Sequence, residues 1–510
     1  MTVLDPAPAL TDAGAPPFAR GPVLGVAGAV AVLLLACSPF YGHFGDELYF
    51  VEAGRHLQWG YADQPPVLPL LAAGLDALAP GSTVVLRLPA VLAVAGIAVL
   101  AALIARELGG HTRAQVTAAG AVAASWFLLA SGRLLATSTL DPFWWALLLW
   151  LLVRWIHAAT GVPRGSSAAL RAAPDRLLVV AGVVLAVALN TKFLVLGLVL
   201  GVGVGVLVAG PRRLLTRPML WLGLAIAALA TVPTLVWQAT HGWPQLQMGG
   251  VVTGEADLFG NRWQFLPVAV LFAGVLPGVV LVLVGLVALL RRPELRPWRG
   301  LGVAVLVTTA AFVVAGGRPY YVAGLYALLF AAGAVALEQR PAQRWWRWTT
   351  GPVALVVCGV ATAVLVLPIG PASAKAQTDF TTMGQLGWPE LAAGVGERYD
   401  ALPPDVRAET VVIASSYWDA SALAYHREAA GLPAVYSPHR GYYDLGVPPG
   451  SAPALVVGEL GAGRGACATY TPLPPYLAPE PTPVLNTVPL ALCTPRAPWA
   501  TVWPGLRSMA

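Results

Sequence analysis

The chain has 510 residues, of which 57% are hydrophobic and 11% charged, and its mean hydropathy is +0.69. A soluble domain carries about a quarter charged residues, so this composition excludes an ordinary soluble protein and indicates a polytopic membrane protein. The net charge of +6 does not indicate a nucleic-acid partner, because the basic residues fall in short clusters between apolar runs, as they do in cytoplasmic loops.

The first elements along the chain are a polar lead and a series of apolar runs. Residues 1–20 are rich in Ala and Pro and are expected to form a disordered cytoplasmic lead. A membrane-spanning helix needs about 20 apolar residues. By that measure the sequence predicts a polytopic α-helical protein with about eleven transmembrane helices, near residues 21–40, 84–105, 114–132, 140–158, 177–190, 193–210, 219–238, 263–290, 300–316, 320–337 and 350–369.

Arginine clusters predict the orientation of these spans. Lys and Arg accumulate in cytoplasmic loops, and here the basic segments occupy every second connection: "RELGGHTR", "RAAPDR", "PRRLLTRP", "RRPELRPWR" and "EQRPAQRWWR". We therefore expect a multi-pass protein of the cell membrane with a cytoplasmic N-terminus. The transmembrane domain is predicted at 21–370, with a long first external loop at 41–83 and an external segment at 371–510.

The segment 371–510 differs from the rest of the chain because it has more Pro and fewer long apolar runs. "ETVVIASS", "PAVYS" and "PALVVG" are typical of strands, and "YWDASALAYHREA" is typical of a helix. This order predicts a small external C-terminal α/β domain. Cys467 and Cys493 lie in this domain, where an oxidising exterior would allow a disulfide, although an isolated pair leaves their pairing open.

Two adjacent carboxylates, Asp46 and Glu47, follow the first span in "FGDELYF". A carboxylate at the membrane surface can take a proton from a hydroxyl group, which contributes about 10²–10⁴-fold to a rate. The same residues would also suit a solvated loop, or a helix N-terminus where the helix dipole favours acids. The pair could contribute to a site for a divalent cation, but two side chains alone do not establish one.

Three isolated charged residues occupy other connections on the same predicted face. Lys192 in "LNTKFLVLG" and Arg318 in "GGRPYY" could hold an anionic headgroup, for which phosphate is the natural candidate. For Lys192, the alternative is a side chain that extends to the membrane interface. Asp141 in "LDPFWW" could cap a helix that opens with Pro, or it could help to position Asp46 or an acceptor.

Aromatic residues complete the candidates for a substrate pocket. His241 and Trp243 occur in "HGWP", and Tyr320 and Tyr321 occur in "RPYY". Their side chains would suit a sugar or an isoprenoid chain. They would equally suit an aromatic belt at the membrane interface, which is the commoner use of such residues.

Taken in order, these segments resemble the family 39 glycosyltransferases, the GT-C enzymes that include protein O-mannosyltransferases and aminoarabinose transferases. The resemblance covers most of residues 21–445. It implies a sugar donor linked to polyprenyl phosphate and inverting catalysis on the outer face of the membrane. The segments that carry it are "FGDELYFVEAGRHLQWGYADQPPVLPLLA", "LNTKFLVLGL", "LVWQATHGWPQLQM", "GGRPYYVAGLYALLFAAGAVALE", "ASSYWDASALAYH" and "LPAVYSPHRGYYDLG".

The resemblance also implies roles for single residues. Asp46 matches the catalytic aspartate of the family and Glu47 matches its neighbour, while Lys192 and Arg318 fall where the family keeps basic residues near the lipid phosphate. The expected partners are a polyprenyl-phosphate sugar donor, a hydroxyl acceptor on a lipid, glycan or protein, and membrane lipids. The tail lacks the carbohydrate-binding repeat module of protein mannosyltransferases, which disfavours a eukaryotic-style protein acceptor.

Two other classes of function stay open at this point. The first is a transporter or flippase for a lipid-linked or anionic substrate, although transporters often show inverted repeats and place charges near the bilayer midplane. Here the polar residues cluster at the external ends of the predicted helices, and no repeat is visible in the sequence. The second is a membrane scaffold whose external domain binds a partner.

Overall fold

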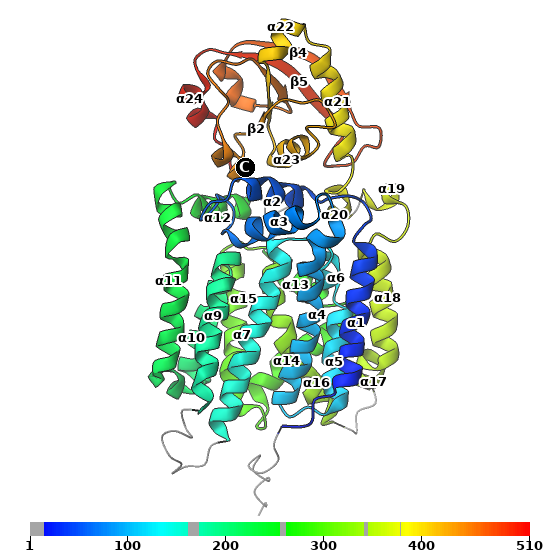
Figure 1. Ribbon diagram of the computed structural model, residues 1–510. Helices are drawn as coiled ribbons and strands as arrows, with labels where there is room; N and C mark the ends of the chain where they lie inside the picture. Colours follow the sequence, from blue (N-terminus) through cyan, green and yellow to red (C-terminus); the bar gives the residue numbers. More distant parts are fainter. Residues whose placement is uncertain (1–14, 162–172, 255–261, 341–344, 378, 510) are drawn as a thin grey trace, which may run out of the picture.

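Three layers make up the computed structural model, which describes residues 15–161, 173–254, 262–340, 345–377 and 379–509. Figure 1 shows a bundle of long helices, a set of short helices that lies across one end of it, and an α/β domain on top of these. The predicted multi-pass helical architecture is confirmed by this arrangement.

The bundle consists of apolar helices, since a helix satisfies its own backbone hydrogen bonds where no water is available. Six of the described helical segments are long and apolar enough to cross a membrane, and the pair α13–α14, bent by 112°, would add a seventh. The helices of the bundle are α1 (Arg20–Cys37), α4 (Thr83–Glu107), α5 (Thr112–Ala123), α6 (Trp126–Ser131), α7 (Thr137–Thr160), α9 (Arg176–Thr191), α10 (Val195–Ala209), α11 (Pro218–Thr240), α13 (Phe265–Phe272), α14 (Pro277–Arg291), α15 (Arg299–Val314), α16 (Tyr326–Glu338), α17 (Trp345–Thr350) and α18 (Pro352–Val366).

Every predicted span overlaps a helix, but the number of eleven transmembrane helices is not confirmed. Helices α9, α10 and α18 are apolar but have only 16, 15 and 15 residues. The span predicted at 114–132 is divided into α5 and α6, because the side chain of Ser125 caps the first turn of α6 and donates a hydrogen bond to the carbonyl of Phe272 at 2.9 Å.

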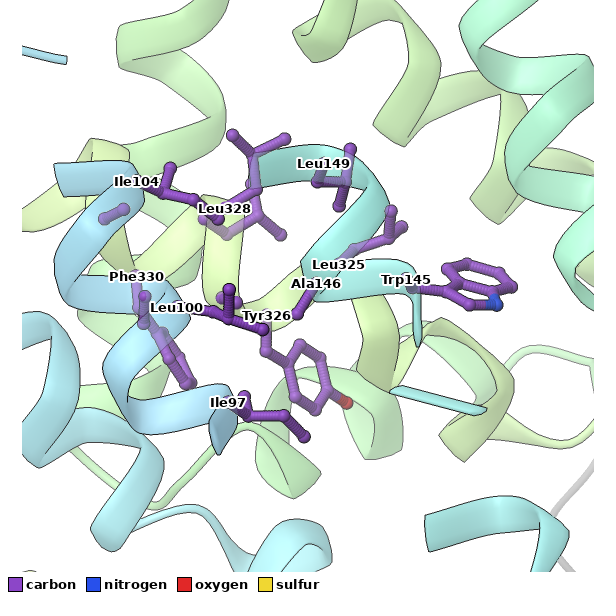
Figure 2. Packing of buried hydrophobic residues seen from close by; sticks show 14 of the residues in the cluster. Ile97, Leu100, Ile104, Trp145, Ala146, Leu149, Leu325, Tyr326, Leu328 and Phe330 are labelled. Atoms are coloured by element: carbon purple, nitrogen blue, oxygen red, sulfur yellow. The ribbon is translucent and has the colours of Figure 1, made fainter. Parts of the chain in front are cut away.

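The centre of the bundle is packed with large apolar side chains. Figure 2 shows residues of α4 and α7 in contact with the segment that runs from η5 (Pro319–Leu325) into α16. Elsewhere glycines bring helices together, as small residues do in membranes. A Cβ atom on Gly182 of α9 would lie 2.2 Å from the Cα of Gly223 on α11, so these two helices touch through their backbones.

The end of the predicted lead 1–20 lies against the bundle. Residues 1–14 lie outside the described residues. Arg106 of α4 donates a hydrogen bond to the carbonyl of Pro16 at 2.8 Å, and Gln115 of α5 bonds Pro17 and Ala19 at 3.1 and 2.9 Å. Backbone groups of residues 16–19 are thus hydrogen-bonded to α4 and α5.

The middle layer separates the bundle from the α/β domain. Its helices are α2 (Gly45–Arg55) and α3 (Val67–Leu78) from the predicted first loop, α12 (Pro244–Gly254), and the short α19 (Ala372–Lys375) and α20 (Phe380–Met383). Helix α2 packs against α3 below and against the α/β domain above. A residue on α2 can therefore contact both domains.

The C-terminal α/β domain is built on a five-stranded sheet in the order β2-β1-β3-β5-β4. Strands β1, β2 and β3 are parallel, while β5 is antiparallel to both β3 and β4. The outer strand β4 carries Pro472, Pro474 and Pro475, which suits an edge strand because proline cannot donate to a further strand. The elements are α21 (Trp388–Asp400), α22 (Pro404–Glu409), β1 (Val411–Ala414), α23 (Tyr417–Tyr425), β2 (Val435–Tyr436), η6 (Arg440–Leu445), β3 (Ala454–Val457), β4 (Cys467–Leu477), β5 (Thr487–Pro495) and α24 (Trp499–Val502).

The sequence patterns located part of this sheet. The strand–helix–strand order predicted from "ETVVIASS" to "PALVVG" corresponds to β1, α23, β2 and β3. The β4–β5 hairpin was not predicted, because its prolines conceal the strand pattern. A disulfide between Cys467 and Cys493 joins the two strands of this hairpin.

Candidate active site

Asp46 lies where the membrane domain meets the α/β domain. It is the second residue of α2, and its Oδ1 atom accepts hydrogen bonds from the Tyr417 hydroxyl and the Trp418 indole Nε1, each at 2.7 Å. Both donors are at the start of α23. The close approach requires glycine at position 45, because a Cβ atom there would lie 2.4 Å from the Trp418 ring.

The second oxygen of Asp46, Oδ2, has no hydrogen-bond partner among the residues that the structure describes. The side chain is partly exposed rather than buried. One oxygen of the carboxylate is thus held by the α/β domain, while the other can accept a proton from a bound molecule.

Glu47 points into a different environment from that of its neighbour. It is fully buried and forms an ion pair with the fully buried Arg87 of α4, with 2.7 Å between Oε2 and Nη2. Its oxygens also accept hydrogen bonds from the backbone N–H groups of Phe44 and Leu135, each at 2.9 Å. The carboxylate therefore joins the start of α2 to α4 and to the segment before α7.

Arg87 extends this network to the end of the first span. Its guanidinium donates to the carbonyls of Ser38 at 2.5 Å and Gly42 at 2.7 Å. Burial alone would raise the pKa of Glu47, but the charge and hydrogen bonds of Arg87 outweigh it and hold that pKa below its usual value. Glu47 is thus a charged structural anchor beneath Asp46.

Asp63 is a second carboxylate near Asp46. It lies in "YADQPP" of the first loop, and its Oδ1 accepts a hydrogen bond from the Tyr49 hydroxyl at 3.0 Å. The pKa of Asp63 is raised to about 6, chiefly by burial, which outweighs the hydrogen bond from Tyr49; the nearby Asp46 carboxylate contributes to the rise and the Arg440 charge opposes it. A group that titrates close to neutral pH therefore lies beside the candidate base.

The α/β domain adds a cation and an imidazole to this cluster. The Arg440 guanidinium lies 5.2 Å from the centre of the Tyr417 ring, and His439 Nδ1 accepts a hydrogen bond from the Tyr417 backbone at 3.2 Å. Burial and the Arg440 charge lower the pKa of His439 to about 4. The imidazole is therefore neutral at physiological pH, as its role as an acceptor requires.

A separate group consists of Lys192, Arg318, Tyr320 and Tyr321. Lys192 ends α9, and its Nζ lies 5.1 Å from the Tyr321 ring centre and 5.8 Å from that of Tyr320. Arg318 donates a hydrogen bond to the Tyr320 hydroxyl at 3.2 Å. The two cations that were predicted to bind phosphate are therefore brought together around one pair of rings.

Asp141 belongs to this second group. Its carboxylate is 4% exposed, accepts a hydrogen bond from Trp145 Nε1 at 3.0 Å, and interacts electrostatically with Lys192. Helix α7 begins at Thr137, one turn before "DP", so the alternative that Asp141 caps this helix is wrong. Asp141 is therefore a buried carboxyl group in the surroundings of Lys192.

His241 and Trp243 lie in a third place, at the end of α11. The His241 ring stacks on Trp237 with 4.0 Å between the ring centres, and Trp237 Nε1 donates to Gln58 of the first loop at 2.8 Å. Trp243 has a positive φ of 56° and is 43% exposed. Among the residues that the structure describes, these two side chains have no hydrogen bond or ring contact with either of the other groups.

The sequence did not identify several members of the Asp46 cluster. Tyr417, Trp418 and Arg440 are about 370 residues or more from Asp46, and only tertiary folding reveals their proximity. Asp63 and these three residues all lay within segments that supported the family resemblance, so a signal for each of them was present. The buried partner of Glu47, Arg87, had an available signal as a lone arginine in the apolar run 84–105.

The possibility of a divalent cation depends on the available carboxylates. Because Glu47 is neutralised by Arg87, the adjacent Asp46–Glu47 pair does not offer two carboxylates to one ion. Over the described ranges, no group of three or more His, Cys, Asp and Glu side chains could hold a metal ion.

Comparisons with known proteins are consistent with this architecture. The family described as dolichyl-phosphate-mannose-protein mannosyltransferase matches residues 63–237. The crystal structure of ArnT from Cupriavidus metallidurans bound to undecaprenyl phosphate has a TM-score of 0.57 and 17% identity, covering 92% of this chain and 97% of that chain. Its apo state has a TM-score of 0.58 with the same identity and coverage.

A more distant match is the oligosaccharyltransferase of Archaeoglobus fulgidus tethered with an acceptor peptide, with a TM-score of 0.47 and 13% identity over 80% of this chain and 63% of that chain. No curated protein sequence matches the chain significantly. The match to the family and the ArnT structures confirm the resemblance predicted from the sequence, and the chain has the fold of GT-C membrane glycosyltransferases.

Proposed function

We propose that this membrane protein with a GT-C fold is an inverting glycosyltransferase that moves a sugar from a polyprenyl-phosphate donor to an acceptor hydroxyl, with Asp46 as the general base. The observation that carries the proposal is the Asp46 carboxylate, which is held through one oxygen and available through the other at the junction of the two domains. The test is whether the protein transfers sugar and whether that transfer depends on Asp46. A scaffold or a flippase would transfer no sugar.

The chemistry needs few protein groups. The acceptor oxygen attacks the anomeric carbon while its proton passes to Oδ2 of Asp46. The bond between that carbon and the phosphate oxygen breaks, and polyprenyl phosphate leaves with the bonding electrons. Inversion follows from this single displacement. A phosphate is a good leaving group, so cations that stabilise its charge can replace a strong general acid.

The group around Lys192 supplies suitable cations for the donor phosphate. Lys192 and Arg318 lie around the same pair of tyrosines, and the buried Asp141 interacts electrostatically with Lys192. The ArnT structure bound to undecaprenyl phosphate supports a lipid phosphate as the ligand class. Tyr320 and Tyr321 would contact the sugar or the first isoprene unit.

Lys192→Ala is expected to raise the donor KM or to lower kcat by roughly 10-fold or more, because a hydrogen bond to a charged group contributes about 1.5–3 kcal/mol. Initial rates over a range of donor concentrations measure both constants. Lys192→Arg is the matched control, since it keeps the cation and should retain most of the donor affinity. Donor kinetics that are unchanged in Lys192→Ala would remove Lys192 from the phosphate site.

We propose different roles for Glu47 and for the pair of His241 and Trp243. His241 packs on a tryptophan that bonds the first loop, so we propose that it and Trp243 contribute to an outer wall of the substrate pocket. For Glu47 we propose an anchoring role through Arg87 in place of direct participation in the reaction. The acceptor is proposed to be a hydroxyl on a lipid, glycan or protein.

The disulfide supports an external α/β domain, because disulfides persist in oxidising compartments. In a Cys37→Ser/Cys358→Ser background, the remaining cysteines are Cys467 and Cys493. We expect a membrane-impermeant maleimide to label intact cells only after treatment with an impermeant reductant. Labelling that requires permeabilised cells would instead place the domain, and with it Asp46, on the cytoplasmic side.

A further inference from the structure

The α/β domain reaches the candidate base through two consecutive residues. Tyr417 and Trp418 form the first turn of α23, and both donate hydrogen bonds of 2.7 Å to the same atom, Asp46 Oδ1. Hydrogen bonds to an ionised carboxylate are roughly twice as strong as bonds between neutral groups. Two such bonds to one oxygen fix the rotation of the carboxylate.

The two donors are themselves held in place. Ser416 Oγ accepts a hydrogen bond from the Trp418 backbone at 3.2 Å and so caps α23. The Tyr417 backbone donates to His439 Nδ1, and the Tyr417 ring lies under the Arg440 guanidinium. These contacts set the donor positions before any substrate binds.

A second contact lies at the same interface between the α/β domain and α2. Gly441 packs on the Tyr49–Asp63 pair, since a Cβ atom there would lie 2.0 Å from the Tyr49 hydroxyl and 3.0 Å from Asp63 Oδ1. The residue before it, Arg440, is held by the C-terminal end of the chain, through a backbone hydrogen bond to Ser508 at 2.7 Å. The α/β domain therefore meets α2 at two fixed points.

We propose that Tyr417 and Trp418 are positioning residues that hold Asp46 Oδ1 and direct Oδ2 towards the acceptor, so that the α/β domain completes the catalytic site of the membrane domain. This inference rests on the proposed function of Asp46 as a base. Both bonds go to one oxygen and leave the other available, so the contact orients the carboxylate without covering it.

The test removes one donor at a time. Tyr417→Phe deletes only the hydroxyl, and Trp418→Phe deletes the indole N–H. Each is expected to lower kcat roughly 10- to 100-fold, since small errors in the position of a reacting group are costly, with the donor KM unchanged. The acidic limb of the pH profile of kcat should move to higher pH. A loss of folded enzyme alone would lower the apparent kcat equally at every pH and would leave the position of the acidic limb unchanged.

Other titratable groups face the same cluster: Tyr49 and Glu47 on α2, Arg87 on α4, Asp63 in the first loop, and His439 and Arg440 in the α/β domain. Among these groups, burial raises the pKa of Asp63 to about 6, within the range of the profile. The profiles are therefore also recorded in an Asp63→Asn background, where the shift caused by Tyr417→Phe should persist.

Tyr399→Phe is the matched control, because the Tyr399 hydroxyl donates a 2.7 Å bond to Arg407 within the α/β domain and away from α2. It should leave kcat and the pH profile unchanged. The inference is overturned if Tyr417→Phe keeps wild-type kcat and profile, or if its activity rises, which would make the contact inhibitory. Wild-type protein without sugar transfer would instead overturn the proposed function itself.

Discussion

Asp46→Asn is expected to lower kcat for sugar transfer by about 10²–10⁴-fold, the usual contribution of a general base. The amide oxygen of Asn can still accept the hydrogen bonds from Tyr417 and Trp418, so the fold and the domain contact should be preserved. The side chain can no longer accept the proton of the acceptor. Steady-state rates of purified variants, normalised to folded protein, measure the effect.

Asp405→Asn serves as the control for this substitution, because Asp405 is an exposed acid on α22 of the α/β domain. Its activity should equal that of the wild type. Near-normal transfer by Asp46→Asn, with unchanged donor and acceptor KM, would exclude Asp46 as the base even if the protein is a glycosyltransferase.

Glu47→Ala is expected to produce the largest loss of stability, about 3–5 kcal/mol, because it leaves the buried Arg87 charge without its partner. It also removes the acceptor for the backbone N–H groups of Phe44 and Leu135. Thermal unfolding in detergent, followed by tryptophan fluorescence, measures the loss. Because α2 loses its anchor, activity should fall with the folded fraction.

The control is Glu397→Gln, whose ion pair with Arg398 lies at the surface with 78% of the glutamate side chain exposed. A surface pair contributes roughly 0–1 kcal/mol, so the unfolding temperature should barely change. If Glu47→Ala were equally harmless, the buried pair would not anchor α2.

The pH dependence of this stabilisation follows from the lowered pKa of Glu47. A carboxylate with a lowered pKa in the folded state stabilises the protein above its unfolded pKa, about 4.3. This stabilisation is lost as the pH falls through the lowered pKa that Glu47 has in the folded state. The anchor should therefore be intact throughout the neutral range and should weaken only as the pH falls below about 4.3.

The sequence predicted those features that depend on local composition. Apolar length placed a helix at each expected span, and the Asp46–Glu47 pair lies in the first turn of a helix, α2, which was one of the alternatives for it. Spans such as 177–190 and 350–369 correspond to helices of 15 or 16 residues, because hydropathy does not fix the point at which a helix ends.

The different environments of Asp46 and Glu47 could not be predicted locally. They are adjacent, yet one contacts the α/β domain and the other the interior of the membrane domain, since neighbouring side chains on a helix point about 100° apart. The partners that decide their roles, Tyr417, Trp418 and Arg87, are distant in sequence. Only the docking of α23 and α4 on α2 assembles them.

The central claim is tested most directly by measuring transfer of radiolabelled sugar from a panel of polyprenyl-phosphate sugars in membranes that contain the wild type or Asp46→Asn at equal levels, with native lipid and cell-wall extracts as acceptors. Our account predicts transfer from at least one donor by the wild type and about 10²-fold less or none by the variant. Wild-type membranes that transfer no more sugar than membranes without the protein would contradict it and favour a transporter or a scaffold.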